Sequence, residues 1–268
     1  MLEQLIRTII LGAIQSLTEW LPVSSTGHLE LTRQFLLPES AAFFEVVVGV
    51  LHIGTLTAVV IFFRHDIKNV FSALARLDFK SEDGKLIPLI IVGTVPAVII
   101  GLSFGTLIEN MFQATLPLAV AFILCGILLY SSRAGKEKTQ VISYMAALAI
   151  GVAQGIAIIP GISRSGATIS VALLLGIQRE KAFKFSLLLS IPTIIGAVGL
   201  TAYRESGLLA SSGFGWPELL VGALVSLIAG YFALKLLWKT IVSKKFYIFA
   251  FYCWLLGAAL TVLSLTTF

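Results

Sequence analysis

Two apolar regions of this sequence, 5–37 and 141–177, are each broken near the middle by residues that end helices. The first contains Pro-Val-Ser-Ser-Thr-Gly at 22–27, and the second contains Pro-Gly-Ile-Ser-Arg-Ser-Gly at 160–166. Proline and glycine interrupt helices, and irregular backbone at membrane depth requires a cavity lined by protein or water. Each half is too short to cross a bilayer, so each region is predicted to be a re-entrant helical hairpin that enters and leaves by one face.

The remaining apolar segments predict six transmembrane helices. Of the 268 residues, 57% are hydrophobic and only 12% are charged, and the mean hydropathy is +0.98, which excludes a soluble globular domain. Runs of about twenty apolar residues are long enough to span a bilayer. The predicted spans are 44–63, 86–108, 111–130, 183–203, 217–237 and 246–267. The predicted fold class is therefore an all-α polytopic membrane protein.

The basic residues predict its orientation. Fourteen of the 19 Lys and Arg residues fall at 64–85, 131–140, 179–184 and 239–245, in segments that alternate along the chain with poorly basic ones. The positive-inside rule makes these segments cytoplasmic, so both termini are expected outside. The pI near 9.3 then has a topological cause, and no nucleic-acid partner is expected.

The two broken regions also resemble each other. A constant shift of 139 residues places Gly12 on Gly151, Gln15 on Gln154, Ser24 on Ser163 and Gly27 on Gly166. Each region is followed by three predicted spans, and three is odd, so the halves 1–139 and 140–268 have opposite orientations. The chain is predicted to be one membrane domain, an inverted-topology repeat whose two broken-helix tips meet near the midplane.

The first broken region carries polar side chains that are costly in hydrocarbon and therefore predict a polar cavity. Gln15 and Glu19 lie four residues apart, on one face of a helix. Their oxygens suit a hard divalent cation such as Mg²⁺ or Ca²⁺, usually beside a substrate phosphate. The alternative for Gln15 is a helix–helix hydrogen bond, and the same packing role is expected for His52 in the first span.

A cluster of hydroxyls and one imidazole follows Pro22. Its members are Ser24, Ser25, Thr26, Gly27 and His28. Ser and Thr favour helix N-caps, and a helix N-terminus binds anions, so a plain capped helix start is the alternative to a substrate site. His28 favours catalysis, because an imidazole near neutral pH acts as acid, base or nucleophile and can activate a serine such as Ser25.

Arg164 is the strongest indication of phosphate binding. A guanidinium at membrane depth needs an anionic partner, and its planar fork suits phosphate oxygens. The residues around it that offer hydroxyls and backbone amides to the same anion are Gly161, Ser163, Ser165 and Gly166. The alternative partner is Glu19, in a salt bridge across the repeat axis; both interactions can hold if the substrate parts that pair.

Together these motifs resemble the undecaprenyl-diphosphate phosphatases linked to bacitracin resistance. The resemblance runs along the whole chain and is sharpest at Gln15–Glu19 (a Glu/Gln-x-x-x-Glu motif), at 22–28 (PVSSTGH) and at 160–168 (PGISRSGAT). It implies hydrolysis of a C55 polyprenyl diphosphate to the monophosphate and inorganic phosphate at the outer face of the plasma membrane, with a divalent cation. This reaction recycles the lipid carrier for cell-wall or glycan synthesis.

The resemblance also implies catalytic positions and an assembly. Glu19, Ser25, His28 and Arg164 occupy the positions tied to catalysis, and the fold is an interlocked inverted repeat that is often a homodimer. The attacking group stays open between Ser25, His28 and water. A carrier or flippase of polyprenyl phosphate is the competing hypothesis, although it would have no use for the chemistry of Ser25 and His28. Membrane type-2 acid phosphatases are excluded, because they need a second histidine where this chain has Ser170.

Overall fold

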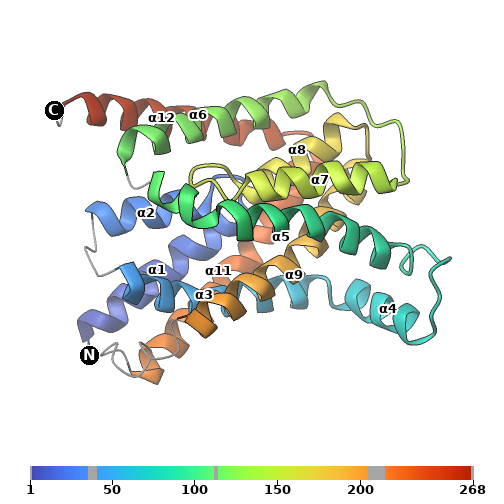
Figure 1. Ribbon diagram of the computed structural model, residues 1–268, viewed down its shortest axis with the longest axis horizontal. Coiled ribbons are helices and arrows are strands. Elements are labelled where there is room, and N and C mark those ends of the chain that lie inside the picture. The colour runs from blue at the N-terminus through green and yellow to red at the C-terminus, as the bar shows by residue number, and fades with distance from the viewer. Residues whose placement is uncertain (1, 36–40, 112–113, 205–214, 267–268) are drawn as a thin grey trace.

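The computed structural model describes residues 2–35, 41–111, 114–204 and 215–266 (Figure 1). Its longer helices are α1 (Leu2–Trp20), α2 (Ser25–Phe35), α3 (Ala41–Phe62), α4 (Arg64–Ala75), α5 (Leu86–Met111), α6 (Thr115–Ser131), α7 (Tyr144–Ile156), α8 (Arg164–Leu174), α9 (Arg179–Arg204), α11 (Trp216–Val242) and α12 (Phe249–Thr266). Two short 3₁₀ helices, η1 (Ser132–Ala134) and η2 (Phe246–Ile248), extend α6 and precede α12. The described residues contain no strand beyond one isolated bridge between Thr139 and Ile177. The predicted all-α class is confirmed.

Five described helices are individually long and apolar enough to cross a membrane. They are α5, α6 with η1, α9, α11, and α12 with η2. The sixth predicted span corresponds to α3, which meets the same criterion only together with α4, and the two are bent by 81° at Phe63. The chain is thus a multi-pass membrane protein, and its described residues contain five candidate spans, or six if the bent pair counts as one.

Both predicted breaks are present. The first apolar region forms α1 and α2 with a turn at 21–24, and the second forms α7 and α8 with a turn at 157–163. Three of these four helices have only 11 to 13 residues, which at 1.5 Å per residue is too short to cross. α1 is longer than predicted, because it begins at Leu2 and continues for 19 residues. The re-entrant course through the membrane stays a prediction.

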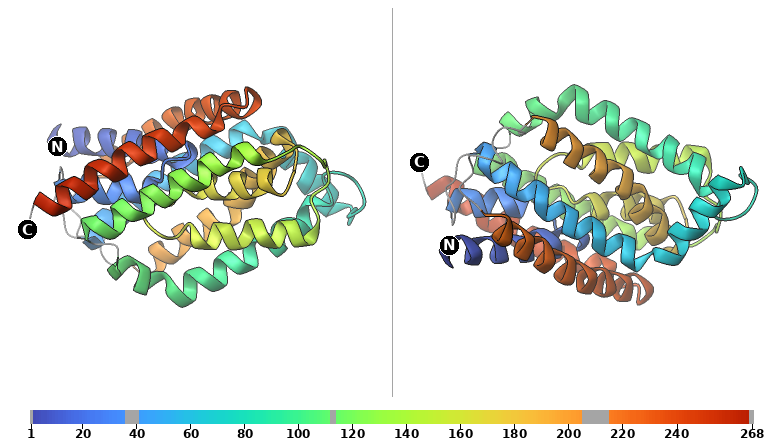
Figure 2. Two further views of the ribbon diagram at one scale, coloured as in Figure 1. Left: turned by 90° about the horizontal axis from the view of Figure 1, so that it is seen from above. Right: turned by 90° about the horizontal axis from the view of Figure 1, so that it is seen from below.

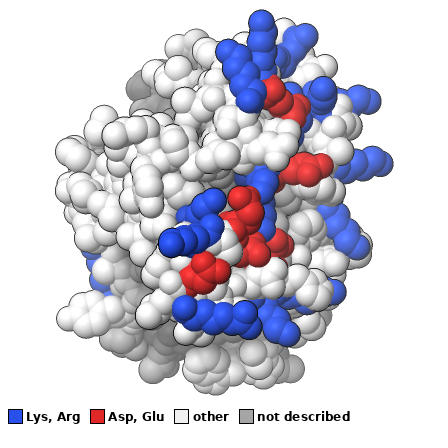
Figure 3. Space-filling view, turned by 90° about the vertical axis from the view of Figure 1, so that its right-hand side faces the viewer, with Lys and Arg blue, Asp and Glu red and all other residues white. Residues whose placement is uncertain are grey.

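Charged side chains gather at one end of the molecule. Figure 3 shows the end where α4 lies, which is opposite both chain termini in Figure 1. Ion pairs there connect separate segments: Lys184 contacts Asp66 at 2.6 Å and Asp83 at 3.2 Å, and Arg179 contacts Glu137 at 3.1 Å. The basic segments predicted to share one side of the membrane therefore meet in space.

The two halves of the chain pack into each other. α1 runs along α11 of the second half, whereas α7 runs along α5 of the first half, and α6 pairs with α12 (Figures 1 and 2). Glycines allow the first two crossings: a Cβ on Gly12 would lie 2.6 Å from the carbonyl oxygen of Gly222, and one on Gly151 would overlap the carbonyl oxygen of Gly93. This reciprocal exchange agrees with the predicted inverted repeat, which itself stays a prediction.

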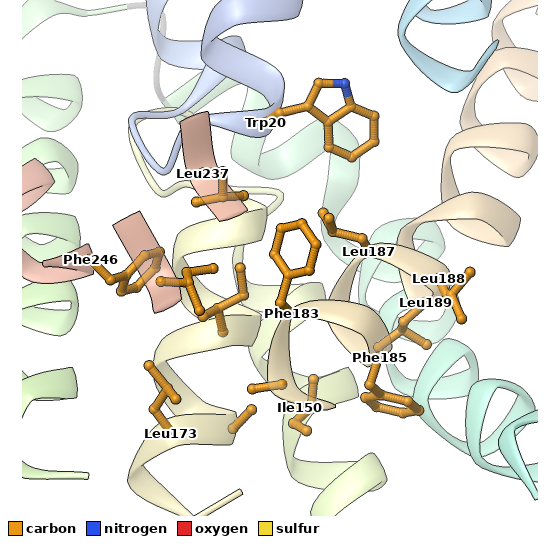
Figure 4. Packing of buried hydrophobic residues seen from close by; sticks show 14 of the residues in the cluster. Trp20, Ile150, Leu173, Phe183, Phe185, Leu187, Leu188, Leu189, Leu237 and Phe246 are labelled. Atoms are coloured by element: carbon orange, nitrogen blue, oxygen red, sulfur yellow. The ribbon is translucent and has the colours of Figure 1, made fainter. Parts of the chain in front are cut away.

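The main apolar core also draws on both halves. Figure 4 shows Trp20 of α1, Ile150 of α7, Phe183 of α9 and Leu237 of α11 in one cluster, and each is at most 1% exposed. Burial of a large apolar side chain of this kind stabilises a water-soluble protein by roughly 1.5–3 kcal/mol. Trp20 is the last residue of α1, so the first turn starts directly at this core.

Candidate active site

Both turns end in a serine that caps the following helix. The Ser24 hydroxyl accepts a hydrogen bond from the backbone N–H of Gly27 (3.3 Å), and the Ser163 hydroxyl accepts one from Gly166 (3.1 Å). The two caps are the pair that the 139-residue shift aligns. Each cap leaves the first amides of its helix available to an anion. A capped helix start, the alternative considered for the cluster after Pro22, is present at Ser24, and Ser163 forms a second cap that was not predicted.

The two turns touch each other directly. The backbone N–H of Gly161 donates to the Ser24 hydroxyl at 3.0 Å, and the Ser165 hydroxyl donates to the carbonyl oxygen of Trp20 at 3.1 Å. Ser24 and Gly161 both have positive φ angles, 70° and 98°, which turn the chain sharply before each helix. Residues about 140 positions apart in the sequence thus form one small polar site.

Glu19 is the centre of that site. One carboxylate oxygen accepts a hydrogen bond from Arg164, and the other accepts from the Ser25 hydroxyl at 2.5 Å and from the Gln15 amide at 3.2 Å. The Glu19 side chain is 3% exposed. A buried carboxylate needs such partners, because an isolated buried charge is very costly. The Arg164–Glu19 salt bridge, predicted as an alternative, is present.

Arg164 is held less completely than Glu19. It is the first residue of α8, and its second terminal nitrogen lies 3.5 Å from the Thr193 hydroxyl of α9. Its side chain is 24% exposed, compared with 3% for Glu19. The N-termini of α2 and α8 lie beside it, and both favour negative charge. The site therefore has the donors that a phosphate group requires.

The sequence matches one protein family over most of its length. A sequence model of the family described as "Bacitracin resistance protein BacA" matches residues 8–259. The chain belongs to this BacA family. An "Undecaprenyl-diphosphatase" of Carboxydothermus hydrogenoformans is 39% identical over 264 residues, covering 96% of this chain and 97% of the relative. Proteins with the same name from Korarchaeum cryptofilum and Methanosphaera stadtmanae are 40% and 39% identical, with 96–97% of this chain and 98% of each relative covered.

His28 of this BacA-family chain does not contact Ser25. Its Nδ1 atom lies 2.8 Å from the carbonyl oxygen of Ser24, and its Nε2 atom lies 2.6 Å from the hydroxyl of Tyr252 in α12. Both ring nitrogens are therefore engaged away from the Ser25 hydroxyl. Ser25 therefore pairs with Glu19 and not, as expected, with His28. The imidazole of His28 lies instead against the carbonyl oxygen of Ser24, which has a left-handed backbone conformation.

Three contributors to the site carried little or no sequence signal. His52 of α3 places Nε2 3.8 Å from a Glu19 oxygen, so it is part of the site rather than only a packing residue. Its own Nδ1 bonds the Val48 carbonyl within the helix. Thr193 and Tyr252 come from the second half and carry ordinary polar groups in apolar spans. For His52, the sequence signal was a polar side chain inside an apolar span. No feature of the nearby sequence distinguished Thr193 or Tyr252 from other polar residues outside the site.

The space next to the ion pair is small. A pocket of about 10 Å³ lies there, lined by Glu19, Trp20, Arg164, Ser165, Thr168, Ser186, Leu187 and Ser190. That is room for roughly one water. A diphosphate is much larger and does not fit this space while the Arg164–Glu19 pair is closed.

Gln15 and Glu19 are the candidate ligands for a divalent cation. The described residues hold no group of three His, Cys, Asp or Glu side chains arranged for a metal. However, the carbonyl oxygen of Gln15 is buried without a hydrogen-bond partner among them, one turn from Glu19. An amide oxygen and a carboxylate are acceptable to Mg²⁺ or Ca²⁺, which commonly complete their shells with substrate phosphate and water. The Gln15 amide group donates an N–H to Glu19, so the two residues would share a cation only after this amide turns its oxygen towards the carboxylate, with phosphate and water supplying the other ligands.

Proposed function

We propose that this protein is an integral-membrane phosphatase that hydrolyses undecaprenyl or a similar polyprenyl diphosphate to the monophosphate and inorganic phosphate. The observation that carries the proposal is the hydrogen bond from Ser25 to Glu19, whose other oxygen binds Arg164 at the N-terminus of α8. Ser25 supplies a nucleophile, Glu19 supplies a base, and the Arg164 guanidinium supplies a positive charge that binds anions, all within one buried site. Membership of the BacA family and the names of the relatives point to the same substrate class.

In the proposed mechanism, the substrate first replaces Glu19 as the partner of Arg164. The guanidinium and the amides that begin α2 and α8 bind the terminal phosphate and stabilise the charge on its oxygens. Glu19, released from Arg164, accepts the proton of the Ser25 hydroxyl. Hydrophobic packing around the turns keeps these groups oriented, so that little reorganisation is needed during the reaction.

The Ser25 oxygen then attacks the terminal phosphorus. The bond from that phosphorus to the bridging oxygen breaks, and its electron pair leaves with the polyprenyl monophosphate. Glu19 passes the proton it took from Ser25 to the departing polyprenyl monophosphate and so becomes a carboxylate again. It then takes a proton from a water, whose oxygen attacks the phosphoserine phosphorus. The bond from that phosphorus to the Ser25 oxygen breaks, inorganic phosphate leaves, and Glu19 returns the proton to the Ser25 oxygen. Gln15 and Glu19 would hold a Mg²⁺ or Ca²⁺ ion, which supplies charge neutralisation for the diphosphate.

The proposal includes an orientation in the membrane and an assembly. The gathering of Lys and Arg at the α4 end supports a cytoplasmic location for that end. In the proposed orientation both termini lie outside, and the site opens to the outer face of the plasma membrane. The family resemblance supports a homodimer. In this orientation the enzyme would recycle the lipid carrier for cell-wall or glycan synthesis on the side where the diphosphate is released.

Phosphate release from a C55 diphosphate in detergent tests the function. The wild-type protein is expected to release phosphate, and the Ser25→Ala and Arg164→Ala variants are expected to lose nearly all of this activity. Well-folded wild-type protein that binds the lipid but releases no phosphate would instead support the carrier hypothesis. Release by Arg164→Ala at close to the wild-type rate would refute the assigned site.

A further inference from the structure

We propose that His28 and Tyr252 act as positioning residues that hold the Ser24–Ser25 turn, and that His28 does not transfer a proton in the reaction. This inference rests on the proposed function and assigns a role within the same site. It follows from the hydrogen bonds of the imidazole, the aromatic groups around it and the backbone of Ser24.

The hydrogen bonds determine the tautomer of His28. The Ser24 carbonyl oxygen can only accept, so the Nδ1 atom that lies 2.8 Å away must carry the proton. In the neutral ring, Nε2 is then the acceptor, and the Tyr252 hydroxyl at 2.6 Å must be the donor. Both nitrogens are occupied by partners that fix the ring, and neither partner is Ser25 or Glu19.

Aromatic packing fixes the same ring from two sides. The Tyr252 ring is stacked on His28 with an interplanar angle of 14° and a centroid distance of 5.7 Å, and the Phe122 ring meets it edge-on at 5.5 Å. Phe122 also takes the space beside Gly27, where a Cβ would lie only 2.6 Å from the ring. The imidazole is therefore clamped between α6 and α12, both outside the first turn.

The residue held by this clamp is conformationally unusual. Ser24 has a φ of 70°, a left-handed conformation that non-glycine residues adopt infrequently and that persists only when its surroundings enforce it. Its carbonyl receives the His28 imidazole, and its hydroxyl receives the N–H groups of Gly27 and Gly161. Ser25 follows directly, so the direction of its hydroxyl towards Glu19 depends on the Ser24 backbone. Tyr252, in the last helix, thus positions the nucleophile of the first half through His28.

Two substitutions of His28 separate positioning from proton transfer. In His28→Asn, the amide nitrogen stands close to the place of Nδ1 and can still donate to the Ser24 carbonyl, but the side chain cannot titrate. We expect His28→Asn to release phosphate within about tenfold of the wild-type rate and His28→Ala to lose about a hundredfold or more. A proton-transfer role would make the two variants equally inactive, because general acid–base catalysis is worth about 10²–10⁴ in rate.

Tyr252→Phe provides a second test that does not depend on the folding of the His28 variants. It removes only the hydroxyl, and we expect kcat to fall about five- to tenfold with KM and the melting temperature unchanged. If Tyr252 acts through His28, adding Tyr252→Phe to His28→Ala should cause no further loss. Tyr247→Phe, the same change near the start of α12 in a contact with Tyr130 and Arg133, should retain wild-type activity.

The outcomes distinguish this inference from the proposed function. Wild-type protein that releases no phosphate would refute the function itself. Active wild-type protein with His28→Asn as inactive as His28→Ala, or with additive losses from His28→Ala and Tyr252→Phe, would overturn the positioning role alone.

Discussion

The hydroxyl of Ser24 accepts a hydrogen bond from the backbone N–H of Gly161, 137 residues further along the chain. This bond joins the turn that ends α1 to the turn that precedes α8. It places the Ser25–Glu19 pair from the first turn next to Arg164 from the second. Neither half of the chain contains the proposed site alone, and the predictions below test that dependence.

Ser25→Ala is expected to lower phosphate release by at least about a thousandfold, because it removes the proposed nucleophile. The melting temperature should fall, because the buried Glu19 carboxylate loses one hydrogen-bond donor, but it should fall less than in Arg164→Ala, which removes the balancing charge. Acid quenching with substrate labelled at the terminal phosphate should trap a labelled wild-type protein and no labelled Ser25→Ala. An active Ser25→Ala variant would point to water or another side chain as the attacking group.

Arg164→Ala should reduce both activity and stability. It leaves the buried Glu19 carboxylate without its cation, and loss of one partner from a buried pair typically costs about 3–5 kcal/mol. The double variant Glu19→Gln/Arg164→Met should recover most of the stability and none of the activity. Thermal unfolding in detergent, measured beside phosphate release, checks both statements; equal melting temperatures for Arg164→Ala and wild type would contradict the first.

Gly12→Ala and Gly151→Ala are each expected to destabilise the fold by about 1–3 kcal/mol, because the added methyl group meets a facing backbone carbonyl at the crossings of α1 with α11 and α7 with α5. Gly105→Ala in α5 is the matched control, since a Cβ there meets nothing within 4 Å. Melting temperatures of the three variants test this expected loss of stability. Similar values for all three would show that these crossings do not require glycine.

Removal of divalent cations with EDTA should abolish phosphate release, and added Mg²⁺ or Ca²⁺ should restore it. Gln15→Ala should raise the cation concentration needed for half-maximal activity by about tenfold, because it removes one of two proposed protein ligands. Thr18→Ala, one residue from Glu19 and bonded only to carbonyl groups of its own helix, serves as the control. Full activity in EDTA would exclude a role for the cation.

Reporter fusions test the orientation. A periplasm-active or surface-active reporter at the C-terminus should function, whereas the same reporter inserted at 78–84, between α4 and α5, should not. The reason is the concentration of Lys and Arg at the α4 end, which the positive-inside rule assigns to the cytoplasm. The opposite pattern would invert the protein in the membrane and move the proposed site to the inner side.

Local sequence was sufficient for the helices and for part of the site. The length of each apolar segment predicted the spans formed by α5, α6, α9, α11 and α12, because a bilayer imposes a minimum helix length whatever the tertiary fold. Proline, glycine and the capping serines located both turns, because these residues act on the backbone within a few positions. Glu19 and Arg164 were identifiable because charged groups in an apolar region need partners.

Tertiary structure alone decided which of these groups meet. The 81° bend between α3 and α4 and the full length of α1 were not predicted, since both depend on packing against other helices. His28 was assigned to Ser25 by proximity in sequence, yet it lies against Tyr252 of α12, and Glu19 took its place beside Ser25. Hydrogen bonds between side chains extend only about 3 Å, so the partners of His28 and Ser25 depend on how the two halves of the chain pack together. Residue spacing along one helix contains no information about a partner 224 positions away.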